Sequence, residues 1–393
     1  MVPSFPQPAS AAAATRPIPG SYGPPLLGPL RDRLDYFWFQ GPDDFFRRRA
    51  ADHKSTVFRA NIPPTFPFFL GVDPRVVAVV DAAAFTALFD PALVDKRDVL
   101  IGPYVPSLAF TRGTRVGVYL DTQDPDHART KAFSIDLLRR AARNWAAELR
   151  AAVDDMLAAV EEDLNRAPDP AAASASYLIP LQKCIFRFLC KALVGADPAA
   201  DGLVDRFGVY ILDVWLALQL VPTQKVGVIP QPLEELLFHS FPLPSFVVKP
   251  GYDLLYRFVE KHGAAAPPVP LQFGRARRDF VLRSHGGAAY EVGKGELLCG
   301  PLAMRDPAVF DRPEEFVPER FLGDDGEALL QYVYWSNGPE TGEPSPGNKQ
   351  CAAKEVVVAT ACMLVAELFR RYDDFECDGT SFTKLDKREL TPS

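Results

Sequence analysis

The sequence predicts a mainly α-helical fold with small β-sheets. Long amphipathic stretches, typical of helices packed on one side, occur at Asn144–Leu164, Tyr177–Val194 and Gly202–Leu218. Asp124 followed by Pro125 marks the start of another helix, because aspartate caps helices and proline suits the first helical position. From Gln272 to Gly300 the pattern changes to strand, with the pair Gly286–Gly287 as a turn.

The remaining elements follow in chain order. The sequence predicts a short helix at Asp43–His53, paired strands at Thr56–Ala60 and Phe66–Val72, and further helices at Pro230–Phe241 and Asp253–His262. Residues 306–321 form a proline-punctuated meander. An apolar helix at Ala352–Arg370 and a short strand-like tail complete the chain.

Composition points to one large domain. The chain has 393 residues, 48% of them hydrophobic, which suffices for a large core, and no linker or repeat divides it. We therefore expect a single domain over residues 16–393 after a tail at 1–15. The net charge of −7 argues against a nucleic-acid partner. The six cysteines show no C-x-x-C or metal-finger spacing, which favours a reduced intracellular compartment.

Two segments bear on localisation. Residues 1–15 are rich in Ala, Ser and Pro without an acidic residue, so they are a degenerate plastid transit peptide or a disordered tail, and the compartment is the chloroplast or the cytoplasm. The apolar run Val356–Ala366 is too short to span a membrane. Phe238–Tyr252 is apolar, aromatic and broken by prolines. It could associate peripherally with a membrane surface, or pack as a loop in the core.

The most informative feature is the segment Trp335–Lys354. Its Gly/Pro-rich loop brings Cys351 to the start of an apolar helix, where free N–H groups and the nearby Lys349 favour a thiolate. The two alanines after Cys351 leave room for a flat cofactor. A haem iron accepts such a thiolate as its proximal ligand. The alternative is a buried cysteine that packs as a small hydrophobe, and the local sequence leaves both interpretations open.

The loop reads N-G-P-E-T at 337–341 and N-K-Q-C-A-A-K at 348–354. It resembles the cysteine loop of the plant cytochrome P450 branch that contains allene oxide synthases, hydroperoxide lyases and divinyl ether synthases. The resemblance extends over most of the chain, and within the branch it is greatest to grass-type allene oxide synthases. It includes Arg16–Gly23, Asp32–Phe37, Asn61–Phe69, Gly117–Thr122, Phe186–Cys190, Pro267–Phe273 and Phe316–Phe321.

The resemblance implies a haem b cofactor with Cys351 as the iron ligand. It assigns the haem propionates to Lys96, His127, Lys131 and Lys349. His127 and Lys131 are four residues apart on one helix and so share a face; a solvated charged face is the alternative. The resemblance also implies a substrate channel, for which ordinary core packing is the alternative. The implied channel residues are Leu100, Val269, Leu271, Phe273, Phe382 and Thr383.

The chain departs from this family in its middle. Relatives carry a long distal helix across the haem and later a helix with the motif E-x-x-R. Here Arg257–Ala266 runs directly into Pro267-Pro268, so we expect a cytochrome P450 fold that lacks both helices through a deletion near 264–268. The letters Glu367/Arg370 follow the cysteine and are a chance match to E-x-x-R. Arg320 loses its expected acidic partners and is a candidate for a stranded charge.

By resemblance, the expected function is dehydration of a fatty acid hydroperoxide to an allene oxide in oxylipin and jasmonate biosynthesis. Homolysis of the O–O bond gives an alkoxyl radical that closes to an epoxide, and loss of an electron and a proton completes the reaction. The oxidant is in the substrate, so no O₂, reductase or NADPH is needed. The alternatives are a hydroperoxide lyase, suggested by Leu100 where some allene oxide synthases have an aromatic residue, and a non-catalytic relic.

Overall fold

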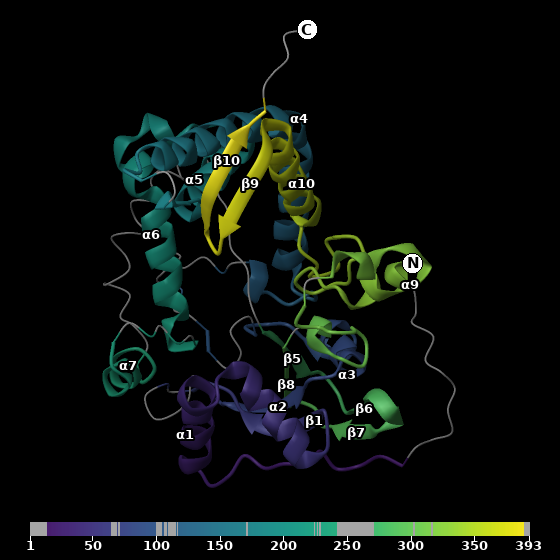
Figure 1. Cartoon of the computed structure of the whole chain (residues 1–393). Helices are drawn as coiled ribbons and strands as arrows, with labels where there is room; N and C mark the ends of the chain where they lie inside the picture. The colour runs from purple at the N-terminus through teal and green to yellow at the C-terminus, as the bar shows by residue number, and fades with distance from the viewer. Residues whose placement is uncertain are drawn as a thin grey trace. The chain divides into compact units, whose positions relative to one another are not determined.

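The computed structural model describes residues 14–63, 69, 71–99, 104–105, 108, 115, 117–169, 172–223, 225, 227, 229–241, 271–301, 303–315 and 317–388 (Figure 1). The predicted helix at 253–262 and the proposed deletion at 264–268 lie outside these residues. The chain divides into two compact units. Unit 1 comprises Met1–Arg129, Gln219–Pro244 and Pro268–Cys351, and unit 2 comprises Thr130–Leu218, Ser245–Pro267 and Ala352–Ser393.

Unit 1 is built on a five-stranded sheet in the order β1-β2-β8-β5-β3. The β2–β8 pair is parallel, and the other three pairs are antiparallel. A separate hairpin pairs β6 with β7 in antiparallel register. The strands of unit 1 are β1 (Val57–Asn61), β2 (Arg75–Val79), β3 (Val94–Asp95), β5 (Gln272–Ala276), β6 (Phe280–Arg283), β7 (Ala289–Val292) and β8 (Leu297–Gly300).

The first strand pair corrects one prediction. β1 confirms the strand expected at 56–60, but its partner is β2, not the predicted strand at Phe66–Val72. Residues 69, 71 and 72 are not in a strand, and the rest of that range lies outside the described residues. The run Arg75–Val79 contains three valines and no proline, whereas 63–72 contains Pro63, Pro64 and Pro67, which cannot donate to a ladder.

The two faces of the sheet bury different clusters because side chains alternate along a strand. On one side Val57, Val77 and Leu298 pack among residues of the 82–94 segment. On the other, Phe58 and Phe273 pack with aromatic residues of the N-terminal helices. Both faces of the sheet are therefore covered within unit 1.

Unit 1 contains short helices around this sheet. α2 begins at Pro42 after Gly41, one residue before the predicted start, and confirms the helix expected at 43–53. Its α-helices are α1 (Leu27–Leu34), α2 (Pro42–His53), α3 (Ala82–Phe85), α7 (Gln231–Leu237) and α9 (Gly323–Leu329). The π and 3-10 turns are η1 (Asp35–Phe39), η2 (Thr86–Phe89), η4 (Gly117–Tyr119), η8 (Val221–Thr223), η9 (His285–Gly287), η10 (Ala303–Arg305), η11 (Pro318–Phe321) and η12 (Leu330–Tyr332).

Unit 2 is mainly helical. The helix that begins at Pro125 is continuous to Asn165, so α4 (Pro125–Asn165) includes the stretch predicted at 144–164; its first residues belong to unit 1. Asp124 caps it as expected, since its carboxylate accepts from the Asp126 amide at 3.0 Å. The other elements are β4 (Ala175–Ser176), α5 (Leu178–Leu189), η6 (Cys190–Val194), η7 (Pro198–Ala200), α6 (Gly202–Leu220), α10 (Lys354–Arg371), β9 (Tyr372–Asp378) and β10 (Ser381–Lys387).

The core of unit 2 lies between α4, α5, α10 and the tail hairpin. Leu149 and Leu157 of α4 contact Phe188 of α5, Val356 of α10 and Tyr372 of β9 in one buried cluster. β9, β10 and β4 form a three-stranded antiparallel sheet in the order β4-β10-β9. Figure 1 shows β9 and β10 as a hairpin beside α10. The predicted strand-like tail is thus a hairpin that packs against part of α10.

The meander of unit 1 satisfies Arg320 through main-chain carbonyls, with no acidic partner among the described residues. Its guanidinium donates to the main-chain carbonyls of Val317, Arg312 and Glu315 at 3.2, 3.1 and 3.0 Å. The charge expected to be stranded is therefore solvated by carbonyl oxygens of its own loop. No described helix combines the length and the hydropathy needed to cross a membrane.

Candidate active site

The loop before Cys351 is folded back on itself. Tyr334 pairs with Pro339, and Ser336 pairs with Gln350, each as an isolated antiparallel bridge. The Cys351 amide donates to the carbonyl of Trp335 at 3.1 Å. The Cys351 side chain is partly exposed, so its sulfur is not sealed in the core. These bonds fix the position of Cys351 relative to both sides of its own loop.

Gln350 fills the centre of this loop. Its side-chain amide donates to the carbonyls of Pro339 and Gly342, both at 2.9 Å. A Cβ atom at Gly338 would lie 2.8 Å from the Cβ of Gln350, closer than side chains pack. The glycine is therefore required for the loop to close around Gln350, which places Cys351 next in the chain.

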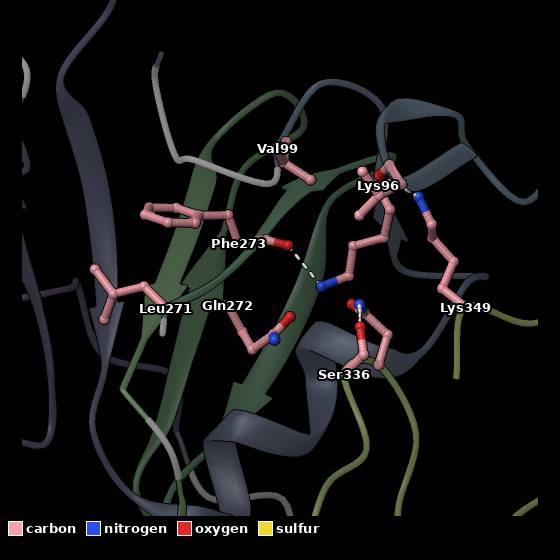
Figure 2. A pocket seen from close by; sticks show the side chains of 9 residues that line it. Lys96, Val99, Leu271, Gln272, Phe273, Ser336 and Lys349 are labelled. Atoms are coloured by element: carbon pink, nitrogen blue, oxygen red, sulfur yellow. Dashed lines mark hydrogen bonds between the residues drawn. The ribbon is translucent and has the colours of Figure 1, made fainter. Parts of the chain in front are cut away.

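A small pocket of unit 1 adjoins the Cys351 loop (Figure 2). Its volume is about 20 Å³, room for about one water-sized group. It is lined by Lys96, Val99, Val118, Leu271, Gln272, Phe273, Ser336, Asn337 and Lys349. Two predicted propionate ligands and two predicted channel residues are thus brought together at one place.

Lys96 is the buried charge of this pocket, with 6% of its surface exposed. Its ammonium donates to the Phe273 carbonyl at 2.5 Å, and the Phe273 ring points away from it (Figure 2). Within the described residues, no carboxylate lies at salt-bridge distance from Lys96. Burial and then the positive charge of Lys349 lower the pKa of Lys96 to about 7. An anionic group in the pocket would relieve both effects.

Lys349 approaches the pocket from the cysteine loop. Its ammonium donates to the Val118 carbonyl at 2.7 Å and to the Leu120 carbonyl. These carbonyls belong to the turn around η4, so Lys349 ties the cysteine loop to that turn. The two lysines therefore come from segments far apart in sequence and converge on one pocket.

Asp121 positions the segment that carries Lys96, directly after β3. Its carboxylate accepts from the Lys96 amide at 3.0 Å, from the Gln123 amide at 3.1 Å and from the Arg277 guanidinium at 2.7 and 2.6 Å. Burial raises the pKa of Asp121, but the hydrogen bonds from Arg277 and the two amides outweigh it and hold the pKa at about 2. The carboxylate is thus a permanent anion that anchors β3.

The other two predicted propionate ligands, His127 and Lys131, lie on α4 and not at the pocket. His127 is buried, with 3% of its surface exposed, in the first turn of the helix, but it does not line the pocket. Lys131 is partly exposed and belongs to unit 2. Spacing places the two on one face of α4, as expected. Their assignment to the propionates stays a prediction.

The predicted channel residues divide in the same way. Leu271 and Phe273 of the β5 segment line the pocket. Phe382 is buried in unit 2 beside Val160 and Ala175, where it contributes to the core, and Thr383 donates to the Glu376 carbonyl at 3.4 Å. The channel roles of Phe382 and Thr383 stay predictions. Leu100 and Val269 lie outside the described residues.

Sequence reasoning missed several residues of this site. Gln272, Ser336 and Asn337 line the pocket, and Asp121 and Arg277 hold its main chain. Asp121 lies within Gly117–Thr122, a segment that resembles the family, and this resemblance is the signal that could have identified it. Arg277 follows β5 in an ordinary charged run, and no local pattern distinguishes it.

The donor set fits the polar edge of a haem. Lys96 is a buried ammonium without a carboxylate in the described structure, and Lys349 shares its pocket, which suits a propionate. Cys351 is a partly exposed thiol at the end of a fixed loop, which suits an axial ligand. The pocket volume corresponds to a small polar group and not to a porphyrin ring.

The chain is similar in sequence to plant enzymes and in fold to cytochromes P450. No family model matches the chain. A protein from Arabidopsis thaliana named linolenate hydroperoxide lyase, chloroplastic, is 43% identical over 95% of this chain and 93% of its own length. Allene oxide synthase 1, chloroplastic, from Oryza sativa subsp. japonica is 37% identical over 93% of this chain and 88% of its own length.

The alignment with the Arabidopsis protein spans 463 positions, more than the 393 residues of the chain, so that relative has internal residues without a counterpart here. Among solved structures, the haem domain of cytochrome P450DA matches with a TM-score of 0.56 and 13% identity, over 95% of this chain and 96% of the other. The fold is that of a cytochrome P450, which implies a haem-thiolate cofactor. The chain therefore belongs to the cytochrome P450 family of plant hydroperoxide lyases and allene oxide synthases.

Proposed function

We propose that this chain binds haem b through Cys351 and acts on a fatty acid hydroperoxide. The observation that carries the proposal is the convergence of Lys96 and Lys349 on one pocket beside the cysteine loop, in a member of this family. Two ammonium groups without a nearby carboxylate for Lys96 form a site for an anion, and a haem propionate supplies one.

The chain's own residues would bind and orient the cofactor. The haem supplies an iron centre that splits the peroxide O–O bond, with thiolate donation favouring the cleavage. Cys351 would ligate the iron from the end of its fixed loop. Lys96 and Lys349 would hold a propionate, and Lys96 would carry its full charge once that carboxylate is present. Leu271 and Phe273 would exclude water from the adjoining apolar wall.

Between the two products of the family, we favour the lyase reaction, which breaks the carbon chain into aldehyde fragments. The hydroperoxide lyase compared above is 43% identical and the allene oxide synthase 37%. Leu100 supports the same choice, because some allene oxide synthases have an aromatic residue at this position. The dehydratase reaction, expected from the grass-type resemblance, is the second candidate. Neither needs O₂, NADPH or a reductase.

We further propose that the shortened chain retains haem weakly and turns over slowly. The excess of aligned positions over chain length supports an internal loss, and the expected place is 264–268. A missing distal helix would open the pocket to water and remove contacts that position the peroxide. Sequencing the transcript across Ala264–Pro268 tests the deletion. An inserted coding segment in every transcript would refute it.

Product analysis tests the function. The purified full chain, reconstituted with haem, is incubated with hydroperoxides of linolenic acid, and products are separated by mass spectrometry. Aldehyde fragments support the lyase assignment, and α- and γ-ketols, formed when an allene oxide hydrolyses, support the dehydratase. Cys351→Ala is the control for haem in solution. Equal product from this control would refute enzyme action by the chain, and a rate equal to that of an intact relative would refute impaired turnover.

The relatives above carry the word chloroplastic in their names, and we propose the same compartment for this chain. A fluorescent fusion of the full chain, imaged against chlorophyll, tests it. Fluorescence confined to the cytoplasm would contradict the proposal.

A further inference from the structure

Gln272 of β5 carries a buried side-chain amide that lacks a hydrogen-bond partner. The residue is 7% exposed, and no group among the described residues bonds to its side chain. A glutamine side chain has two N–H donors and a carbonyl acceptor, and burying them unpaired is costly. Buried polar groups of native proteins are normally paired, so this amide indicates a missing ligand.

The sheet fixes the place of this amide. Gln272 is the first residue of β5 and lies opposite Gly300 of β8 in the antiparallel ladder. Because side chains alternate along a strand, Gln272 shares a face with Ala276, which packs in one apolar cluster, whereas Phe273 packs in the cluster on the other face. An apolar side chain would suit the position of Gln272, so core packing does not explain an amide there.

The Gln272 amide faces the pocket that also holds the Lys96 ammonium. Figure 2 shows both groups directed into the same space, and all residues that line the pocket belong to unit 1. Lys96 is 6% exposed and donates to the Phe273 carbonyl, which leaves other N–H groups of its ammonium available. Two buried side chains with spare donors therefore meet in a pocket of about 20 Å³.

A second amide, that of Asn337, lines the same pocket with the opposite polarity. Its nitrogen donates to the Ser336 hydroxyl at 3.0 Å, and its oxygen is buried without a hydrogen-bond partner. An amide oxygen is an acceptor and repels a carboxylate, which is an acceptor as well. Of the two amides, Gln272 is therefore the one that can donate to an anion.

We propose that Gln272 is a haem-binding residue whose side-chain nitrogen donates a hydrogen bond to the propionate held by Lys96 and Lys349. The inference rests on the proposed function, since it requires haem at this site. The two ammonium groups supply charge, and the amide, fixed by its strand, supplies a directed bond to one carboxylate oxygen. In the haem-free chain the same amide stays unpaired, so Gln272 lowers stability until the cofactor binds.

Gln272→Leu separates this role from a structural one. Transfer of haem from the full chain to excess apomyoglobin, followed by absorbance, should be at least ~10-fold faster in the variant, because a hydrogen bond to a charged group is lost. The haem-free variant should nevertheless unfold at a higher urea concentration, because the unpaired amide is gone. Gln231→Leu, at an exposed glutamine of unit 1, is the matched control and should change neither quantity.

Gln272→Glu tests the position of the side chain without haem. Burial lowers the pKa of Lys96 to about 7, so the free energy of unfolding of the haem-free unaltered chain should rise from pH 7 to pH 10.5. A carboxylate at position 272 would pair with Lys96 and keep it charged, so most of this rise should disappear. In the haem-loaded chain the same carboxylate should repel the propionate and speed haem transfer more than Gln272→Leu does.

The outcomes separate this inference from the proposed function. If the unaltered chain binds haem and both variants at position 272 release it no faster, the role of Gln272 is refuted and the proposed function stands. Faster release from Gln272→Leu together with a lower haem-free stability would also refute it, because the residue would then be structural. A pH profile of haem-free Gln272→Glu that matches the unaltered chain would show that position 272 does not face Lys96. An unaltered chain that binds no haem would refute the proposed function and the role of Gln272 together.

Discussion

Removing the Lys96 charge should stabilise the protein without bound haem. Lys96→Met retains most of the apolar stem and deletes the ammonium. In the unaltered chain, burial and the Lys349 charge lower the pKa of Lys96 from 10.5 to about 7. At about 1.4 kcal/mol per pKa unit, this depression costs the folded state about 5 kcal/mol at pH 7. Loss of the hydrogen bond to the Phe273 carbonyl offsets about 2 kcal/mol, which leaves a net gain of about 3 kcal/mol.

The pH dependence has a defined sign. Between pH 7 and pH 10.5 the unfolded chain retains the Lys96 proton that the folded chain has released. The free energy of unfolding therefore rises with pH across this window in the unaltered chain, and this rise is absent from Lys96→Met. The advantage of the variant should shrink by about 1.4 kcal/mol per pH unit, so that the net gain of about 3 kcal/mol vanishes near about pH 9 and reverses above it.

Urea denaturation followed by circular dichroism, at several pH values in this window, measures the effect. Lys294→Met, at an exposed lysine of unit 1, controls for the loss of one positive charge. A difference between the unaltered chain and Lys96→Met that does not change with pH would refute the reasoning. So would an equal gain from Lys294→Met.

Three further predictions concern the same site. Cys351→Ala should abolish the thiolate-type Soret band of the haem-loaded chain, and an unaltered spectrum would remove Cys351 as the iron ligand. Asp121→Asn should lower the free energy of unfolding by about 3 kcal/mol, because it leaves the Arg277 charge without its anion. Since the pKa of Asp121 is about 2, the stabilisation by its carboxylate should be full above about pH 4 and decline toward pH 2. Acid denaturation of the unaltered chain that matches that of Asp121→Asn at every pH would contradict this. Gly338→Ala should displace Gln350 and reduce haem retention in a dilution assay, and retention equal to that of the unaltered chain would show that the loop tolerates the added carbon.

The sequence predicted helices well where a capping residue, a proline or a regular apolar spacing marks them locally. Asp124 and Pro125 located the start of α4, and the apolar periodicity located α10. The partner of β1 was misplaced, because the aromatic run at 66–72 suits a strand in composition, whereas Pro67 within it cannot donate to a ladder. The valine run at Arg75–Val79, which lies outside that range, forms the strand instead.

The site depended on contacts that sequence does not display. Lys96 and Lys349 were identified by resemblance, and both line one pocket, while their assignment to the haem propionates stays a prediction. Asp121 and Arg277 are 156 residues apart, and a bidentate pair over such a separation leaves no periodic signal. The sequence did not predict that Glu367 is buried, for a similar reason: its partner Arg150 lies on another helix.

Arg320 has a consequence for how this chain tolerates loss. Its three carbonyl acceptors all lie within residues 312–317, so the guanidinium closes a ring with its own loop. A loop restrained from within needs no neighbouring helix to keep its shape. A change elsewhere in the chain would then leave the shape of this stretch intact. The meander can thus keep its shape whether or not the rest of the chain is active, and its presence is no measure of catalysis.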